Sequence, residues 1–241
     1  MAEIIPAIIP ESLEDLKEKL SLVENYVNTI QVDVTDGKFV PNKSWPYYGA
    51  GYDDYFTSIL KEETGLPLWE KIDYEIDLMV KKPELVIDDW VKAGARRIII
   101  HIESTLDIKE VLQKLNQQYS SVRNTLVGVD FGVAINISTN NQVLYDLLDI
   151  VDEKGMGLID FVQFMGIDRI GFQGHPLDNR VFDKIKNLRN KYPAMVISVD
   201  GGVTEENASE LVQAGVNRLV SGSAIFGSDN PMQTLEYFKS L

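Results

Sequence analysis

The chain has 241 residues, 44% of them hydrophobic, so it can bury the core of one αβ barrel or of two small domains. Its formal net charge of −14 would repel phosphate backbones and anionic lipid, so we expect neither nucleic acid nor membrane as a partner. Cysteine is absent, which excludes disulfides, thiolate metal sites and a cysteine nucleophile. The N-terminal residues show no targeting pattern and no apolar run reaches bilayer length, so we expect a soluble cytoplasmic protein. No break in composition divides the chain, and we expect residues 1–241 to form a single domain.

Short apolar runs alternate with helical patterns along the chain. The first helix is marked by Ser12 with Asp15 three residues later, and Gly94 ends another. The expected strands are residues 3–9, 29–34, 74–80, 97–102, 126–136, 161–165, 194–199 and 218–220. The expected helices are residues 12–20, 55–62, 83–93, 108–115, 141–148, 179–191, 204–214 and 231–240.

These eight strand-then-helix units predict a (β/α)8 TIM barrel, with a doubly wound open sheet as the alternative. Polar or glycine residues recur where the expected strands end, and in a barrel those ends converge on one mouth. The polar residues expected to face this common cavity are Gln31, Asp33, Asp77, His101, Glu103, Asn136 and Asp200.

The stretch 30–42 carries the strongest sign of chemistry. It begins as a buried strand in which Gln31 and Asp33 share one face, and Thr35, Asp36 and Gly37 then stop the strand. A buried carboxylate needs a metal, hydrogen bonds or a raised pKa, and it marks a site more often than a core. The other interpretation, that the carboxylate only caps a turn, fits Asp36 better than Asp33.

Small residues at the last three strand-to-helix connections predict a phosphate site. Loops after the seventh and eighth strands of such barrels bind phosphate beside a helix N-terminus, although glycine also ends many αβ connections for steric reasons. The candidate phosphate-binding residues are Gly171, Gly174, Gly201, Gly202, Gly222 and Ser223.

Several motifs taken together resemble the ribulose-phosphate 3-epimerase family. They occur in family order over nearly the whole chain, at residues 32–42, 77–80, 101–103, 132–136, 199–203 and 214–227. The resemblance implies a ribulose-phosphate-binding TIM barrel with a small phosphorylated sugar as partner, acting in pentose phosphate metabolism. It also implies an isomerase that moves a proton off and onto the carbon beside a ketone. Asp33 and Asp200 match the catalytic acid and base, and a divalent metal stabilises the enediolate in the family.

The chain departs from the family at the metal ligands, which indicates a divergent member. The two family histidines are replaced by Gln31 and Asp77. The carbonyl of Gln31 with Asp33, Asp77 and Asp200 would form an all-oxygen site, which suits Mg²⁺ or Mn²⁺ better than Zn²⁺. A metal-free site with one protonated aspartate is also coherent.

Other departures lie around these positions. Pro10 replaces a serine, Thr35 replaces a methionine, and the loop at 166–175 looks one residue longer than expected. Met79 and Met165 do stand where the family keeps methionines. Either these methionines contact the substrate or they support residues that do, and the same holds for the remaining polar candidates, His101, Glu103 and Asn136.

Two alternatives to a ribulose 5-phosphate epimerase stay open. One is a non-catalytic phosphosugar-binding paralogue, and the other is an epimerase for a different phosphorylated sugar. Retention of both Asp33 and Asp200 favours an enzyme, because a pure binder gains little from two apposed carboxylates.

The aromatic stretch 45–56 has three interpretations. It could be a lid over the ligand, a contact between subunits, or a loop packed on the barrel rim. We expect a homo-oligomer.

Overall fold

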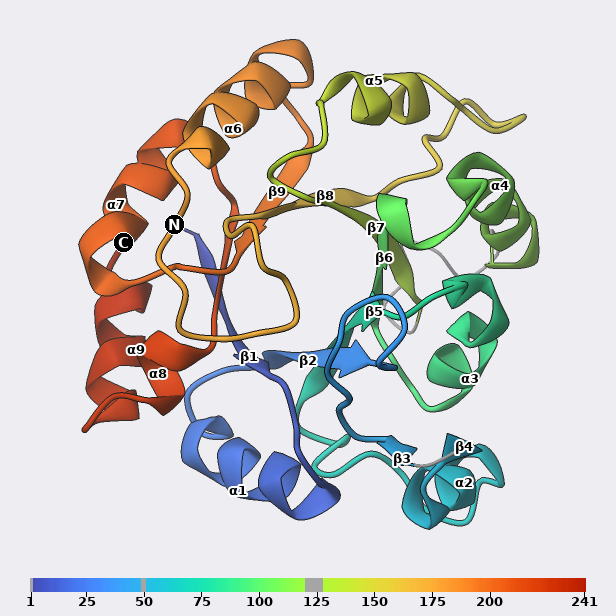
Figure 1. The fold of residues 1–241 in the computed structure, drawn as a ribbon, viewed down its shortest axis with the longest axis vertical. Helices are drawn as coiled ribbons and strands as arrows, with labels where there is room; N and C mark the ends of the chain where they lie inside the picture. Colours follow the sequence, from blue (N-terminus) through green and yellow to red (C-terminus); the bar gives the residue numbers. More distant parts are fainter. Residues whose placement is uncertain (1, 49–50, 120–127) are drawn as a thin grey trace.

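The computed structural model describes residues 2–48, 51–119 and 128–241. Within these residues, eight parallel strands form a closed barrel in the order β1-β10-β9-β8-β7-β6-β5-β2 (Figure 1). The barrel strands are β1 (Glu3–Ile8), β2 (Thr29–Thr35), β5 (Asp73–Met79), β6 (Arg97–His101), β7 (Asp130–Ile135), β8 (Phe161–Met165), β9 (Val196–Asp200) and β10 (Arg218–Ser221). The predicted TIM barrel is confirmed, and the open doubly wound sheet is excluded because β1 pairs with both β2 and β10.

Helices surround the barrel (Figure 1). They are α1 (Leu13–Val23), α2 (Asp54–Leu60), α3 (Ile87–Lys92), α4 (Ile108–Tyr119), α5 (Gln142–Leu148), α6 (Arg180–Lys191), α7 (Glu205–Ala214), α8 (Ser223–Phe226) and α9 (Pro231–Lys239). Two 3₁₀ turns, η1 (Pro83–Leu85) and η2 (Ile102–Ser104), follow β5 and β6, and a two-stranded hairpin, β3 (Tyr47–Tyr48) with β4 (Gly51–Tyr52), precedes α2. None of these helices combines the length and the apolar character needed to cross a membrane.

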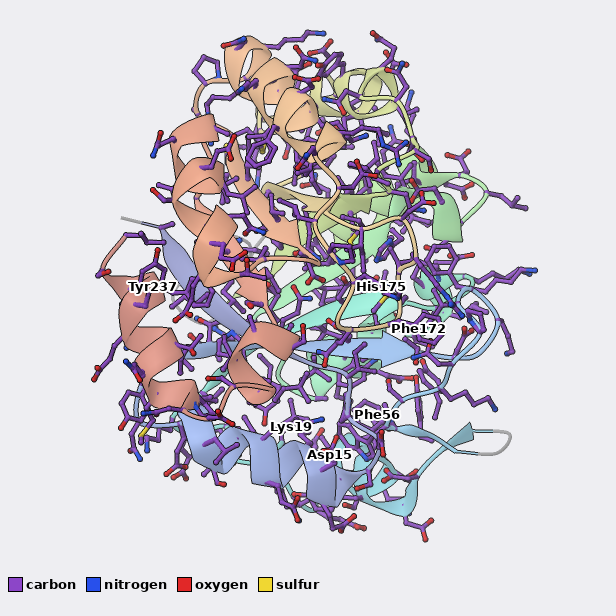
Figure 2. All side chains as sticks on the ribbon, turned by 60° about the vertical axis from the view of Figure 1, so that its left-hand side comes forward. Asp15, Lys19, Phe56, Phe172, His175 and Tyr237 are labelled. Atoms are coloured by element: carbon purple, nitrogen blue, oxygen red, sulfur yellow. The ribbon has the colours of Figure 1, made fainter. Side chains whose placement is uncertain are left out.

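Local sequence explains several helix starts. The Ser12 hydroxyl accepts a hydrogen bond from the backbone N–H of Asp15 at 3.0 Å, which confirms the helix start predicted from these two residues. Asp15 also pairs with Lys19 one turn later, at 2.9 Å (Figure 2). Thr204 caps α7 in a capping box with Asn207.

Two expected elements differ from the structure. The single helix expected over 83–93 is divided into η1 and α3, because Val86 between them has φ −129° and ψ −8° and is not helical. The strand expected over 126–136 is β7, and the first residues of the expected range lie outside the described residues.

The barrel interior is polar at both ends. At the N-terminal ends of the strands, Arg97 donates to Glu3 at 3.2 Å and lies 3.4 Å from Glu75, while Arg218 lies 3.2 Å from Glu3. Glu75 is fully buried in this ionic layer. The larger apolar core lies outside the barrel, between the strands and the helices, so the interior is free to hold polar groups.

The aromatic stretch packs on the barrel rim. Trp45 is fully buried, and its ring makes edge contacts with Phe56 at 5.6 Å and Trp90 at 6.2 Å. Its indole N–H donates to the Asp53 carboxylate, which caps α2, at 2.6 Å. These residues therefore join β2 to α2 and α3, as predicted if the stretch is a loop packed on the barrel rim.

Candidate active site

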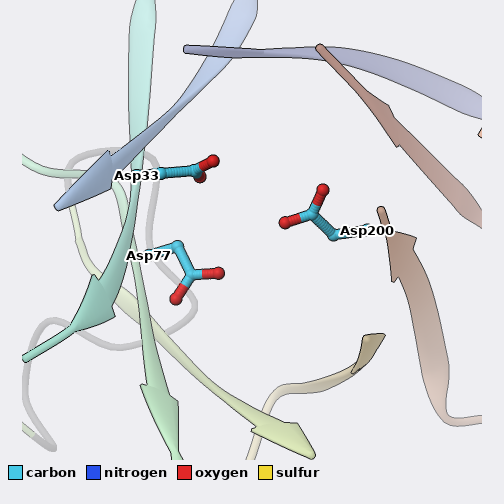
Figure 3. A group of neighbouring side chains, drawn as sticks. All are labelled: Asp33, Asp77 and Asp200. Atoms are coloured by element: carbon cyan, nitrogen blue, oxygen red, sulfur yellow. The ribbon is translucent and has the colours of Figure 1, made fainter. Parts of the chain in front are cut away.

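Three buried aspartates face one another inside the barrel mouth. Asp33 comes from β2, Asp77 from β5 and Asp200 from β9, and their side chains point into the same space (Figure 3). One oxygen from each lies within 4.8 Å of the other two. The barrel thus brings together residues far apart in the sequence, as their positions at strand ends predict.

Gln31 connects two of these carboxylates. Its Nε2 donates to Oδ1 of Asp33 at 2.7 Å and to Oδ2 of Asp200 at 3.0 Å. Its Oε1 is buried without a hydrogen-bond partner among the described residues. The amide nitrogen of Gln31 therefore faces the two carboxylates. The sequence predicted that the carbonyl oxygen would face them. Oε1 can act as a metal ligand only if the side-chain amide flips.

Asp77 accepts hydrogen bonds on both oxygens. Nε2 of His101 lies 2.9 Å from Oδ1, and Nε2 of Gln163 donates to Oδ2 at 3.0 Å. All three residues are fully buried. Sequence reasoning missed Gln163, although its signal was the same as for Gln31: a polar residue inside a short apolar strand.

The surroundings of Asp33 and Asp200 raise the pKa values of both carboxyl groups and so favour their protonated forms. Burial, followed by repulsion from Asp200 and Asp77, raises the pKa of Asp33 well above its usual range. Burial and repulsion from Asp77 raise the pKa of Asp200 to about 7. Burial alone would lower the pKa of His101, but the adjacent Asp77 carboxylate outweighs it and raises that pKa. Two carboxyl groups with raised pKa values can carry a proton between them near neutral pH.

The predicted phosphate residues line the same cavity as Asp33 and Asp200. All six, from Gly171 to Ser223, contribute to its wall, together with Met79 and Met165. Gly202 has φ +73°, and a Cβ there would lie 2.5 Å from the backbone nitrogen of Leu177. A Cβ on Gly222 would lie 2.2 Å from Nε2 of Gln173, so the backbone at this end is closely surrounded.

The loop 166–178 after β8 covers this cavity. In Figure 1 it crosses the mouth of the barrel between β8 and α6, and Figure 2 labels Phe172 and His175 within it. Nε2 of Gln173 donates to the carbonyl oxygen of Ala7 at 3.1 Å, which ties the loop to β1. His175 lines the cavity, and the Arg169 guanidinium stacks on Phe172 at 4.4 Å.

Glu103 and Asn136 form a separate cluster at the end of β7. Oε1 of Glu103 accepts from the backbone N–H of Asn136 at 3.0 Å and from the hydroxyl of Thr139 at 2.6 Å. Neither residue lines the cavity that holds Asp33 and Asp200. Gln31, Asp77 and His101 do not line it either, so of the seven polar residues expected to share one cavity only Asp33 and Asp200 do. Their contacts hold the β7 connection in place.

The triad has the chemistry of a site for a hard divalent cation. Three carboxylates and an amide can supply oxygen donors, and burial and mutual repulsion, which raise the pKa values of Asp33 and Asp200, would be relieved by a cation. The residues present therefore fit a divalent metal.

The sequence of the chain is similar to those of known proteins over nearly its whole length. The model of the ribulose-phosphate 3-epimerase family matches residues 3–226, which include all the barrel strands. The chain belongs to this family. The chloroplastic ribulose-5-phosphate-3-epimerase of Arabidopsis thaliana is 30% identical over 98% of this chain and 76% of the relative. The ribulose-phosphate 3-epimerase of Aquifex aeolicus is 28% identical over 100% of this chain and 97% of the relative.

The protein is thus an isomerase that belongs to the sugar-phosphate epimerases. Solved structures support the fold: KGPDC from Streptococcus mutans superposes with a TM-score of 0.67 at 14% identity, covering 100% of this chain and 96% of that one.

Proposed function

We propose that the protein interconverts D-ribulose 5-phosphate and D-xylulose 5-phosphate by moving a proton at C3. The observation that carries the proposal is that Asp33 and Asp200, from opposite sides of the barrel, line one cavity with the glycine-rich loops. Family membership supports the same reaction.

The two carboxyl groups act as base and acid on opposite faces of the substrate. The ionised carboxylate removes the C3 proton, and the electron pair of the C–H bond moves toward the C2 ketone to give an enediolate. The protonated carboxyl then returns a proton to C3 from the other face, which inverts the centre. Burial and repulsion from neighbouring carboxylates raise the pKa values of both Asp33 and Asp200, which allows the pair to hold one proton at neutral pH.

A divalent metal would be held by Asp33, Asp77 and Asp200, with Gln31 contributing Oε1 after its amide turns. Bound there, it would supply positive charge that stabilises the enediolate. Because every donor is oxygen, we propose Mg²⁺ or Mn²⁺ rather than Zn²⁺.

The phosphate group lies against the backbone N–H groups of the loops after β9 and β10. Gly201 and Gly202 follow β9, while Gly222 and Ser223 follow β10. Glycine lets the backbone come close to phosphate oxygens, and small residues leave room for the group. Binding the phosphate here places the ketone end of the substrate over the carboxylates.

Proton NMR of D-ribulose 5-phosphate in D₂O tests the reaction. The protein is supplied with Mg²⁺, Mn²⁺, Zn²⁺ or chelator, and we expect deuterium at C3 and xylulose 5-phosphate to appear, fastest with Mg²⁺ or Mn²⁺. No exchange under any of these conditions would refute the assignment. Binding of the sugar phosphate without exchange would then identify a phosphosugar-binding protein or an epimerase for another sugar.

A further inference from the structure

Asp77 is held by residues from two other strands. Its carboxylate is fully buried on β5, His101 reaches Oδ1 from the neighbouring β6, and Gln163 reaches Oδ2 from β8. A carboxylate that accepts at both oxygens from two different strands has a fixed orientation, because rotation about its last bond would break both hydrogen bonds.

The register of the barrel explains how Gln163 can reach Asp77. Ala134 on β7 is the register partner of His101 on one side and of Gln163 on the other. An alanine at this level places only a methyl group between the two long side chains, so both can extend toward Asp77. His101, Ala134 and Gln163 thus form a layer across β6, β7 and β8, with the two donors on β6 and β8.

This layer does not contribute to the wall of the substrate cavity. Asp33 and Asp200 line the cavity, whereas Asp77, His101 and Gln163 do not. Gln163 is therefore placed to act on Asp77 and not on a ligand in the cavity. Its Oε1 has no hydrogen-bond partner among the described residues, so its amide is held through the hydrogen bond from Nε2 to Asp77.

We propose that Gln163 is a positioning residue that holds the Asp77 carboxylate facing Asp33 and Asp200, where it serves as a metal ligand. The inference rests on the metal site of the proposed function, and it adds a residue that the sequence analysis did not include. Without the amide, one oxygen of Asp77 would lose its donor and the carboxylate could turn away from the other two.

The test measures binding of Mn²⁺ alone by calorimetry. Gln163→Met keeps the length of the side chain and removes the donor, and we expect Mn²⁺ affinity to fall about 10- to 100-fold. Ser198→Ala is the matched control, because Ser198 is fully buried, is the register partner of Gln163 on β9, and has no hydrogen-bond partner for its hydroxyl among the described residues. The control should bind Mn²⁺ as the wild-type protein does.

A double-mutant cycle with Asp77→Asn shows whether Gln163 acts through Asp77. In the Asp77→Asn background, Gln163→Met should change Mn²⁺ affinity by less than about threefold, because the carboxylate that it positions is already lost. A purely structural role would give the same loss in both backgrounds. Gln163→Asn, which withdraws the amide by one methylene, replaces Gln163→Met if circular dichroism shows that the methionine variant does not fold.

Three outcomes would overturn the proposal: wild-type affinity in Gln163→Met, an equal loss in both backgrounds, or no Mn²⁺ binding by the wild-type protein. The last would mean that Asp77 is not held as a ligand. Failure of the proposed function is distinguishable, because a protein that binds Mn²⁺ but does not exchange the C3 proton would refute epimerisation and leave the positioning role standing. In an active enzyme, Gln163→Met should lower kcat and leave KM nearly unchanged, since Gln163 does not line the cavity.

Discussion

Glu75 makes the stability of the barrel depend on pH. It is fully buried in the ionic layer at the N-terminal ends of the strands, within 3.4 Å of Arg97 and 3.9 Å of Arg218. Burial outweighs both arginines and raises the pKa of Glu75 from its ordinary 4.5 to about 7. The perturbation that isolates this group is Glu75→Gln, which keeps the shape and removes the charge.

The direction in which the free energy of unfolding changes with pH follows from proton binding. Between pH 4.5 and 7 the folded protein keeps the Glu75 proton that the unfolded chain has released, so the free energy of unfolding falls as pH rises through this window. Each pH unit between the two pKa values is worth about 1.4 kcal/mol, which gives a loss of about 3 kcal/mol by pH 8. Below pH 4.5 the group is protonated in both states and contributes no pH dependence.

Urea unfolding of the wild-type protein and Glu75→Gln, measured from pH 4.5 to pH 8, tests this reasoning. The difference between them should move by about 3 kcal/mol in favour of the variant as pH rises. Glu210→Gln, an exposed position on α7, controls for the loss of one negative charge. A difference that does not vary with pH, or one that moves in favour of the wild-type protein, would show that the arginines compensate for burial.

Three further predictions concern the site and its rim. Asp33→Asn and Asp200→Asn should each slow C3 exchange in D₂O by about 10²- to 10⁴-fold, because each removes the acid or the base. Gly222→Ala should raise KM for the sugar phosphate about tenfold in steady-state assays, since its Cβ would lie 2.9 Å from the carbonyl oxygen of Ala7 and meet a clash of about 1–3 kcal/mol. Trp45→Ala should lower the free energy of unfolding in urea by about 3–5 kcal/mol, because it empties a fully buried site between two aromatic rings.

Each of these predictions has a result that contradicts it. Exchange by either asparagine variant within tenfold of wild type would remove that aspartate from proton transfer. An unchanged KM in Gly222→Ala would place the phosphate elsewhere in the cavity. A loss below about 1 kcal/mol in Trp45→Ala would mean that the rim aromatics are not part of the cooperative core.

The barrel was predictable because its signals are local. Apolar runs, the cap at Ser12 and the glycine-rich strand ends each depend on a few neighbouring residues, and eight repeats of one unit leave few alternatives. The division of the helix expected over 83–93 was not predictable from periodicity, because it depends on the backbone of Val86.

The site was predictable in part, because a strand end places a residue at the mouth but does not set its neighbours. Asp33, Asp77 and Asp200 were expected to meet, and they do. The orientation of the Gln31 amide and the reach of Gln163 across Ala134 depend on the register between strands, which no single segment of sequence encodes.

Closure of the barrel brings together the two ends of the sheet, with consequences for biosynthesis. Glu3 on β1 and Arg218 on β10 are register partners and are also joined by an ion pair. Because they are about 200 residues apart, β1 would wait roughly 10 to 40 s for β10 at a synthesis rate of about 5–20 residues per second. During that time the strand edges of the nascent sheet are open, and folding on the ribosome therefore depends on keeping them from pairing with other chains.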